Sequence, residues 1–291
     1  MSTPRYRGRF APTPSGPLHF GSLVAALGSW LDARHHGGQW LLRIEDIDPP
    51  RERPGAARAQ LQALAAFGLQ ADEPVRFQRH RHAAYDAALD RLRQRDMLFP
   101  CRCSRSDLAA THGIHRACVA RPSAPHPAWR LRIADGEIAF RDRRLGDIRE
   151  DTGRTVGDVV LRRSDGLYAY QLAVVVDDAA QGITDVVRGA DLLDSTARQI
   201  AVQRALGLPT PRYLHLPLAL GPDGEKLSKS LAACPVDVDQ PVATLSAAWR
   251  FLLPDLPVPV ENALPAWLDR AAERYRPQAL RTADAVPAAA D

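Results

Sequence analysis

The sequence predicts an α/β fold with a parallel sheet, and three observations support this prediction. The chain opens with an expected strand, loop, helix and strand, which together make a βαβ unit. A second run of alternating strands and helices begins near residue 157. Hydrophobic residues make up 45% and charged residues 25% of the 291 residues, which suits one or two globular domains with a large core.

The first βαβ unit is predicted from apolar spacing and from its glycines and prolines. Residues 6–10 form the first expected strand, and residues 11–17 contain too much proline and glycine for a helix or a strand. Apolar residues recur at helical spacing over residues 21–36, and the pair Gly37-Gly38 ends that helix. Residues 39–44 are expected to form a buried strand.

The later elements are predicted in the same way. The expected helices span residues 55–67, 82–95, 191–206, 242–252 and 264–275. The expected strands span residues 129–133, 137–140, 158–162, 183–188 and 214–220. Residues 101–127 break this rhythm and look like an inserted module.

The chain is accordingly divided into four segments. Residues 1–98 hold the first half of a nucleotide-binding domain, and residues 99–155 hold the inserted module. Residues 156–230 hold the second half of that domain, and residues 231–291 form a helical C-terminal part whose alanine-rich tail is expected to fray.

Composition narrows the class of protein. No apolar run approaches the roughly 18 residues needed to cross a bilayer, and the first residues lack the apolar stretch of a secretory signal. We therefore expect a cytoplasmic protein with no membrane partner. Four cysteines in such a chain argue against a disulfide framework. The net charge of +4 fits a nucleic acid or polyphosphate partner, although an arginine-rich background explains it equally well.

The lysines are unusually placed. The chain has 38 lysines and arginines, yet its two lysines, Lys226 and Lys229, both lie in the stretch KLSKS at residues 226–230. Lysine offers a compact, rotatable ammonium, whereas arginine offers a planar fork. Lysine at two neighbouring positions of an arginine-using chain indicates a specific chemical demand. The alternative is chance placement on a loop.

A second motif lies where the first loop becomes a helix. The sequence HFGS at residues 19–22 would present free backbone N–H groups at the positive end of a helix dipole. Gly21 would let a bulky group approach the backbone, and His19 could donate to a phosphate oxygen. This arrangement suits a nucleotide at the carboxyl edge of a parallel sheet. By itself the motif also fits a simple helix start with an exposed histidine.

Together the two motifs resemble the two ATP motifs of the class I aminoacyl-tRNA synthetases. The stretches RFAPTPSG (residues 9–16) and RIEDID (residues 43–48) resemble those of the glutamyl branch of this class. The Cys-x-Cys pair at residues 101–103, the stretch YAYQLA at residues 168–173 and the short C-terminal part are similar to the glutamyl-Q tRNA(Asp) synthetases. These are truncated paralogues of the glutamyl-tRNA synthetases. The resemblance covers about residues 5–267.

The resemblance implies a fold and an activity. The expected fold is a Rossmann-like class I synthetase catalytic domain with a parallel sheet, an inserted zinc-containing module and a small helical C-terminal part. The expected enzyme activates L-glutamate with ATP as glutamyl-adenylate and transfers glutamate to queuosine at the wobble position of tRNA(Asp). Mg²⁺ is expected with ATP, and the protein is expected to be a monomer. His19 and Lys229 are the expected catalytic residues, and the ATP-binding residues would be His19, Gly21, Ser22, Lys226, Ser228 and Lys229.

Glutamate carries two carboxylates and one ammonium, so its pocket should offer two cations and one anion. Positions that match glutamate contacts of the family supply this count in Arg9, Arg188 and Glu45. The sequence does not assign either arginine to either carboxylate. The implied glutamate-binding set is Arg9, Phe10, Ala11, Pro12, Thr13, Glu45, Tyr170 and Arg188. Without the resemblance, the arginines would be surface or phosphate-facing residues, Glu45 would lie on a solvated loop and Tyr170 would be a core aromatic.

A zinc site is expected in the inserted module. Cys101, Cys103 and Cys118 fall in one short window, and three thiolates with one imidazole would complete a tetrahedral zinc shell. The resemblance implies such a site here, with His115 as the first candidate for the fourth ligand and His112 as the second. With four protein ligands, the zinc would be structural. The alternative is three reduced thiols in a loop.

Two rival functions remain open. The first is the catalytic part of an ordinary glutamyl-tRNA synthetase, against which the length after Ser230 argues, since about sixty residues are too few for a helical anticodon-binding domain. The second is a non-catalytic RNA-binding relative of a synthetase. Degraded ATP motifs would favour that rival, whereas both motifs are present here.

Overall fold

The computed structural model describes residues 5–119, 126–220 and 235–284. Its helices are α1 (Phe20–His35), α2 (Ala56–Ala66), α3 (His82–Arg93), α4 (Tyr170–Ala180), α5 (Leu193–Leu206), α6 (Pro241–Leu252) and α7 (Leu264–Arg274). Its strands are β1 (Arg7–Phe10), β2 (Gln39–Ile44), β3 (Arg76–Phe77), β4 (Leu98–Cys101), β5 (Ala128–Leu131), β6 (Glu137–Asp142), β7 (Gly146–Asp151), β8 (Val159–Arg162), β9 (Asp185–Gly189) and β10 (Arg212–Leu216).

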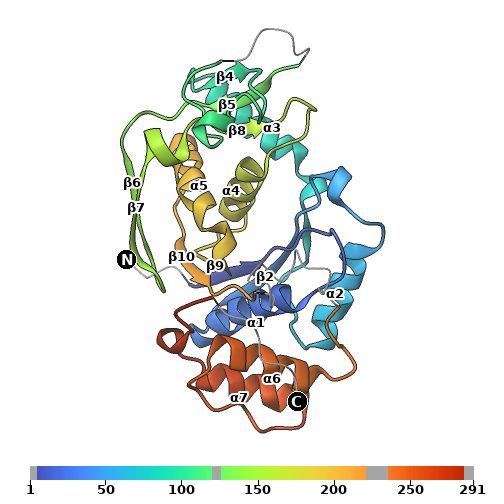
Figure 1. Ribbon diagram of the computed structural model, residues 1–291. Coiled ribbons are helices and arrows are strands. Elements are labelled where there is room, and N and C mark those ends of the chain that lie inside the picture. The colour runs from blue at the N-terminus through green and yellow to red at the C-terminus, as the bar shows by residue number, and fades with distance from the viewer. Residues whose placement is uncertain (1–4, 120–125, 221–234, 285–291) are drawn as a thin grey trace.

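Parallel strands from both ends of the chain form the centre of the molecule. β1, β2 and β3 pair in parallel, and β9, β10 and β6 form a second parallel set. The backbone N–H of Thr184 donates to the carbonyl of Arg7 at 3.0 Å, so the start of β9 lies beside β1. Residues that follow β1, β2, β9 and β10 therefore meet at one edge (Figure 1), where ligands bind in open α/β sheets. The predicted α/β fold is confirmed.

Helices cover both faces of these strands. On one face α1 packs against α6 and α7, with Leu27, Trp249 and Trp267 in a shared core. On the other face α3, α4 and α5 enclose a second core that includes Leu172 and Ile200. Figure 1 shows α4 and α5 on the side of the strands opposite α1. Among the described residues, none of the helices combines the length and apolar character needed to cross a membrane.

The turn after α1 shows why two glycines follow that helix. Gly37 has φ +58°, in the left-handed region that ends many helices. A Cβ at Gly38 would lie 2.5 Å from the carbonyl oxygen of Tyr6, so a side chain at this position would push β1 away. The glycine pair therefore lets the chain leave α1 and return directly as β2 beside β1.

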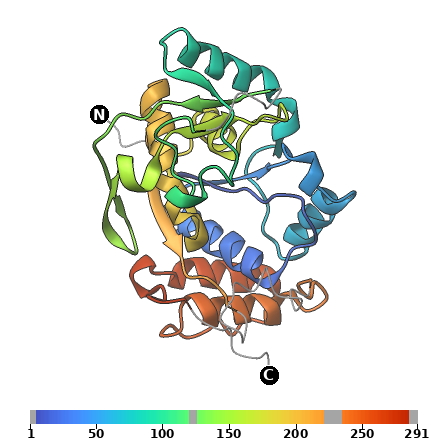
Figure 2. The same ribbon diagram turned by 45° about the horizontal axis from the view of Figure 1, so that its top comes forward.

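The inserted module is an antiparallel sheet of β4, β5 and β8. β8 had been expected among the strands of the second α/β half, yet it pairs with β5, because Val159–Arg162 returns alongside the module. Conversely, the hairpin β6–β7 leaves the module and joins the main strands through the pairing of Asp142 with Tyr213. Figure 2 shows the module above the main strands. The four-segment division of the chain stays a prediction.

Most predicted elements recur within a few residues, but several observed features were not predicted. The helix α4 was not predicted, because its buried aspartates Asp177 and Asp178 interrupt the apolar pattern of a core helix. The strands β3, β4 and β7 were not predicted either. The tail was expected to fray from residue 276, but Leu280 is buried and Arg281 donates to the carbonyl oxygen of Phe251 at 2.8 Å. The expectation of fraying is thus wrong for residues 276–284.

Candidate active site and metal-binding cluster

The start of α1 is capped by the predicted ATP-site histidine. His19 has an extended backbone, and its ring accepts a hydrogen bond from the backbone N–H of Ser22 at 3.3 Å. No acidic residue occupies the first turn of this helix. The dipole of α1 is therefore not opposed by a local negative charge, which favours an anion at this end.

Gly21 is not required by the packing of the protein. A Cβ at this position would lie 3.5 Å from the ring of His19, an ordinary contact distance. Gly21 also keeps a helical backbone with no positive φ. The absence of a side chain there leaves space above the first turn of α1, which is the space that a phosphate group would use.

The predicted lysine motif cannot be placed. Lys226, Ser228 and Lys229 lie outside the described residues. The described chain resumes at Pro235, which forms an antiparallel bridge with His19, and Val236 donates to the carbonyl oxygen of Leu18 at 3.1 Å. The chain that follows the lysine motif is therefore attached to the start of α1.

Four charged side chains gather beside the ends of β1 and β2 and are called the Asp178 cluster: Arg9, Arg43, Glu45 and Asp178. The carboxylate of Asp178 accepts from Arg9 Nε at 3.2 Å and from Arg43 Nη1 at 2.7 Å. Arg43 also donates to Glu45 Oε1 at 3.2 Å. All four residues are more than 90% buried, and their formal charges cancel.

The two acids of this cluster differ in how well they are neutralised. Burial raises the pKa of Asp178, but Arg9 and Arg43 outweigh it, so this pKa lies below its usual range. Burial dominates at Glu45 and raises its pKa, although Arg43 and Arg9 act against it. Glu45 is thus a buried carboxylate with too little positive charge around it, and an ammonium group would correct that deficit.

Arg188 lies on β9 in a different setting, called the Arg188 cluster: Arg188, Thr196, Gln199 and His215. The guanidinium donates to Gln199 Oε1 at 2.8 Å, to Thr196 Oγ1 at 2.8 Å and to His215 Nε2 at 3.2 Å. Arg188 is 5% exposed, and no carboxylate lies within 4.0 Å of it in the described parts of the chain. It is therefore a buried cation surrounded by neutral partners.

Tyr170 links the two clusters. It opens α4, and burial raises the pKa of its hydroxyl. The charge of Glu45 raises this pKa further, while the charges of Arg188 and Arg9 lower it. Groups must lie close together to act on one hydroxyl in this way. Glu45, Arg188 and Arg9 are therefore near enough to Tyr170 for their charges to act on its hydroxyl.

The loop after β1 contributes mainly through its backbone. The carbonyl oxygen of Pro12 accepts from the N–H of Glu45 at 2.9 Å, and the carbonyl oxygen of Thr13 accepts from Gln60 Nε2 at 3.1 Å. Ala11 connects this loop to β1. Phe10 instead stacks on Trp40 at 6.4 Å between ring centroids, so its ring belongs to the core. The loop fixes Glu45 in position, whereas Phe10 supports the strand.

The predicted metal ligands come together. Cys101, Cys103, His115 and Cys118 each offer a ligand atom, and these atoms all lie within 4.8 Å of one another. His115 Nδ1 lies 2.9 Å from Asp158 Oδ2, which leaves Nε2 facing the sulfurs, 3.2 Å from Cys101 Sγ. A carboxylate behind a histidine ligand is typical of zinc sites. His112, the second candidate for the fourth ligand, is not in this group.

The crowded thiols favour their protonated form in the absence of a cation. Burial raises the pKa of Cys118 to about 11, and the neighbouring Cys101 raises it as well. A metal ion would reverse this effect, because a coordinated thiol is deprotonated. Three sulfurs and one imidazole fit a structural zinc ion in number and type.

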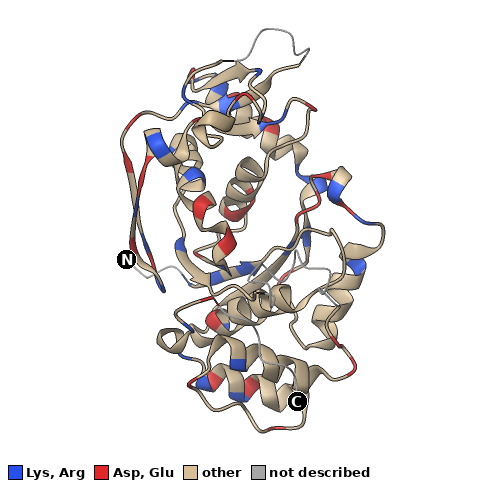
Figure 3. Ribbon diagram, in the orientation of Figure 1, with Lys and Arg blue, Asp and Glu red and all other residues tan. Residues whose placement is uncertain are grey.

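The arginines at residues 141–144 and 162–163 form basic clusters in the sequence, a pattern typical of a solvated surface, and several of them pair with other parts of the fold. Arg143 pairs with Asp32 at 2.6 Å, and Arg144 donates to the carbonyl oxygen of His215. Arg163 pairs with Asp48 at 3.1 Å. Figure 3 shows acidic and basic residues interspersed over the fold. These arginines therefore tie elements together.

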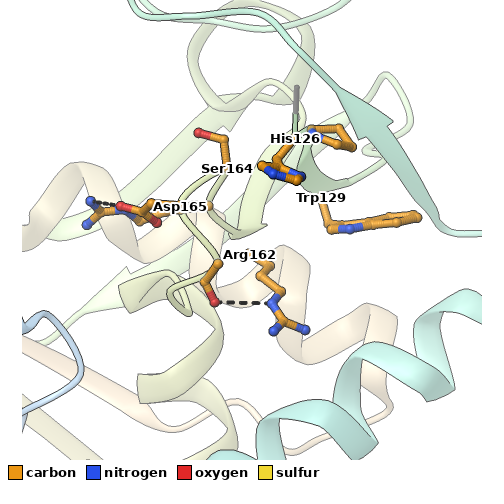
Figure 4. Close-up of a pocket in the computed structure, with 8 residues that line it drawn as sticks. His126, Trp129, Arg162, Ser164 and Asp165 are labelled. Atoms are coloured by element: carbon orange, nitrogen blue, oxygen red, sulfur yellow. Dashed lines mark hydrogen bonds and ion pairs between the residues drawn. The ribbon is translucent and has the colours of Figure 1, made fainter. Parts of the chain in front are cut away.

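Two hollows lie apart from the predicted site residues. One, of about 320 Å³, belongs to the inserted module, where Trp129, His126 and Arg162 line it (Figure 4). Arg162 donates to the carbonyl oxygen of Gly166 at 3.2 Å there. The other, of about 360 Å³, is lined by Asp46, Glu52 and other residues next to the loop after β1. None of the predicted site residues lines either hollow.

Five residues of the two clusters were not anticipated from the sequence: Arg43, Asp178, Thr196, Gln199 and His215. Arg43 lies in the RIEDID stretch, but a central strand would normally bury apolar residues. The others are polar residues within buried helices or strands. A polar residue at an apolar position of a predicted element is the signal that could have found them.

Comparisons with known proteins identify the family and the fold of the chain. The family model described as tRNA synthetases class I (E and Q), catalytic domain, matches residues 5–126 and 125–243. A glutamyl-Q tRNA(Asp) synthetase from Xanthomonas campestris pv. campestris (strain 8004) is 59% identical over 282 residues, covering 96% of this chain and 95% of that relative. One from Pseudomonas putida (strain W619) is 50% identical, covering 99% of both.

A solved structure shares the fold. Glutamate-tRNA synthetase from Elizabethkingia anophelis superposes with a TM-score of 0.81 at 25% identity, covering 98% of this chain and 68% of that one. The described helices and strands of the present chain therefore follow an architecture seen in an experimentally determined synthetase.

Proposed function

The chain belongs to the class I tRNA synthetases (E and Q) as a catalytic domain and is a ligase, and we propose that it activates L-glutamate with ATP and transfers the glutamyl group to queuosine in the anticodon wobble position of tRNA(Asp). The names of relatives 50–59% identical over nearly the full chain support this acceptor. The proposal implies a cytoplasmic location, where tRNA is found, and we expect a monomer.

The proposal that the substrate is glutamate rests mainly on one observation. Arg188 is a buried cation among neutral partners, and Glu45 is a buried carboxylate with too little positive charge. A zwitterion with a carboxylate for Arg188 and an ammonium for Glu45 would satisfy both. The neighbouring Arg9 and the hydroxyls of Tyr170 and Thr13 supply donors for a second carboxylate, as glutamate requires.

The first step needs little proton chemistry. A carboxyl group of glutamate is ionised at pH 7, so its oxygen can attack the α-phosphorus of ATP without a general base. The new bond forms a mixed anhydride as the bond to pyrophosphate breaks. Catalysis then depends on alignment and on stabilising phosphate charge. The α1 start with His19 and Gly21 would hold phosphate oxygens, and Ser22, Lys226, Ser228 and Lys229 would complete that site. Mg²⁺ would accompany ATP and neutralise its phosphates.

The second step moves the glutamyl group. A hydroxyl of queuosine would attack the carbonyl carbon of the adenylate, and AMP would leave with the bonding electrons. We assign Cys101, Cys103, His115 and Cys118 to a zinc ion that stabilises the inserted module. With four protein ligands, this ion would have no open position for substrate.

Pyrophosphate exchange with glutamate tests the proposal. We expect exchange with glutamate in the absence of tRNA, and transfer of labelled glutamate to tRNA(Asp) that contains queuosine. The control acceptors are tRNA(Asp) without queuosine and tRNA(Glu). Exchange that requires tRNA, with transfer to tRNA(Glu), would instead identify an ordinary glutamyl-tRNA synthetase. No exchange with any amino acid would end the enzyme hypothesis.

A further inference from the structure

The side chain of Arg188 is oriented by a histidine from the neighbouring strand. Arg188 Nε donates to His215 Nε2 at 3.2 Å, and β9 and β10 pair these two residues directly. For Nε2 to accept, it must carry no proton, so the ring must be neutral with its hydrogen on Nδ1. His215 is fully buried, so no water can replace this contact without rearrangement.

A buried carboxylate fixes that form of the ring. His215 Nδ1 lies 2.7 Å from Asp142 Oδ2, which also accepts the backbone N–H of His215 at 3.0 Å. The other oxygen of Asp142 accepts the backbone N–H groups of Arg144 and Leu145 at 3.0 and 2.9 Å. Asp142 therefore acts as an acceptor at every contact and leaves His215 to donate through Nδ1.

The surroundings of His215 favour its neutral form. Burial lowers its pKa, and the charge of Arg188 lowers it further, while the hydrogen bond to Asp142 opposes these effects. Tyr213 stacks on the ring at 6.1 Å between centroids, and Thr196 Oγ1 lies 3.2 Å from Nε2. Arg144 donates to the carbonyl oxygen of His215 and not to its ring. Among the described residues, the ring contacts the side chains of Asp142, Arg188 and Thr196, with Tyr213 stacked on its face.

We propose that Asp142 and His215 are positioning residues that set the plane of the Arg188 guanidinium and thereby the affinity for the acidic amino acid. Three of the five guanidinium N–H groups are engaged by His215, Thr196 and Gln199 in the described structure. One N–H on each terminal nitrogen stays available for a carboxylate. Holding Nε fixes the direction of both, since the guanidinium is planar. This inference rests on the proposed role of Arg188 in binding glutamate.

The test separates positioning from folding by comparing two substitutions at one position. His215→Gln can present its amide oxygen to Arg188 Nε, whereas His215→Ala cannot. In pyrophosphate exchange we expect His215→Ala to raise the KM for glutamate about tenfold, the loss of one charged hydrogen bond. The KM for ATP should stay unchanged, and kcat should change by less than about threefold. His215→Gln should recover most of the glutamate affinity, and Asp142→Asn should fall between the two.

Two further measurements complete the test. His80→Ala removes a similar contact on the surface, where Arg79 Nε donates to His80 Nε2 at 3.3 Å, and should leave every KM unchanged. Nitrogen-15 NMR of the wild-type protein should show His215 protonated at Nδ1, a result that requires neither a variant nor activity. Equal KM values for His215→Ala and His215→Gln, or a ring protonated at Nε2, would overturn the inference.

The outcomes distinguish this inference from the proposed function. If the wild-type protein shows no exchange with glutamate, the proposed function fails, and the NMR result still decides the tautomer. If exchange occurs but the variants raise the glutamate and ATP KM values equally, the function stands and the positioning role is overturned. If His215→Ala does not fold, His215→Gln and Asp142→Asn still give the comparison.

Discussion

The Asp178 cluster and the Arg188 cluster bury arginines at the same edge of the strands in opposite ways. Arg9 and Arg43 share the carboxylate of Asp178, so their charge is neutralised inside the protein. Arg188 is held by Thr196, Gln199 and His215, none of which is an anion. Neutral partners fix a cation without cancelling its charge, whereas a carboxylate does both. The first arrangement holds Arg9 and Arg43 in fixed positions, and the second leaves the charge of Arg188 available to an anion.

The largest effect should come from a change outside both clusters. Lys229→Ala should reduce pyrophosphate exchange below detection, because the variant lacks the ammonium proposed to stabilise phosphate charge. Both clusters should be intact, so the melting temperature should change little. Lys229→Arg is the matched control and should recover little activity, because a planar fork does not replace a point charge. Undiminished exchange in Lys229→Ala would remove Lys229 from the mechanism.

The comparison predicts that Arg188 matters for binding more than for folding. Arg188→Ala should raise the KM for glutamate about 100-fold, since truncating one partner of a buried charged contact costs about 2–5 kcal/mol. The KM for ATP should be unchanged. Its loss leaves neutral groups unpaired but leaves no buried charge, so unfolding should be affected modestly. A rise in the ATP KM equal to that for glutamate would contradict the pocket role.

The Asp178 cluster should show the reverse pattern. Asp178→Asn should lower the free energy of unfolding by about 3–5 kcal/mol at pH 7, because Arg9 and Arg43 lose the anion between them. Chemical denaturation measures this loss. Asp177→Asn is a matched control on the same helix, where the lost carboxylate accepts from Arg81, Gln78 and Tyr85 instead. An Asp178→Asn variant that kept its stability but weakened glutamate binding would contradict this assignment.

The pH dependence of stability gives a finer check on this cluster. The pKa of Asp178 is depressed in the folded protein. Its contribution is therefore fully present above the unfolded value of about 3.9 and is lost as pH falls through the lower folded value. The wild-type protein should lose stability over this acidic window, and Asp178→Asn should lose less over the same window. Parallel stability curves for the two proteins would contradict the assignment.

The smallest effect on glutamate binding is expected from changes to the metal cluster, which lies in the inserted module. Metal analysis should find about one zinc per chain, and His115→Ala should lower this content and the melting temperature. His112→Ala, three positions away, should retain the full content. Exchange by the remaining folded His115→Ala protein should keep its glutamate KM. A chain that binds no zinc would leave Cys101 as an ordinary thiol.

Local patterns made the α/β fold predictable, and they failed where charge is buried. The helix over residues 20–35 and the strand over residues 39–44 follow from apolar spacing and the glycine pair. α4 could not be found in this way, because Asp177 and Asp178 interrupt its apolar face and are neutralised by residues about 100 to 170 positions away in the chain. The pairing of β8 with β5 likewise depends on contacts between distant parts of the sequence, which the local pattern of a strand does not reveal.

The candidate site could be predicted from the sequence only where the type of a residue indicates its chemical role. Glu45, Arg9, Arg188 and Tyr170 were selected by resemblance, and in the structure the charges of the first three act on the hydroxyl of Tyr170. Their supporting partners were not selected, because a sequence does not reveal which buried polar side chain faces which. Asp142 lies within the arginine-rich stretch at residues 141–144, a pattern typical of a solvated surface and not of a buried support.

The sharing of Asp178 between two arginines also limits how this protein can change. Replacing Arg9 or Arg43 alone would leave the buried carboxylate of Asp178 with one neighbouring arginine instead of two. Substitutions at Arg9, Arg43 and Asp178 are therefore expected to be tolerated only in combination. Arg188 is not paired with a carboxylate in this way. Efforts to redirect the pocket to another amino acid should therefore begin at Arg188 and its neutral neighbours, and leave the trio on β1, β2 and α4 untouched.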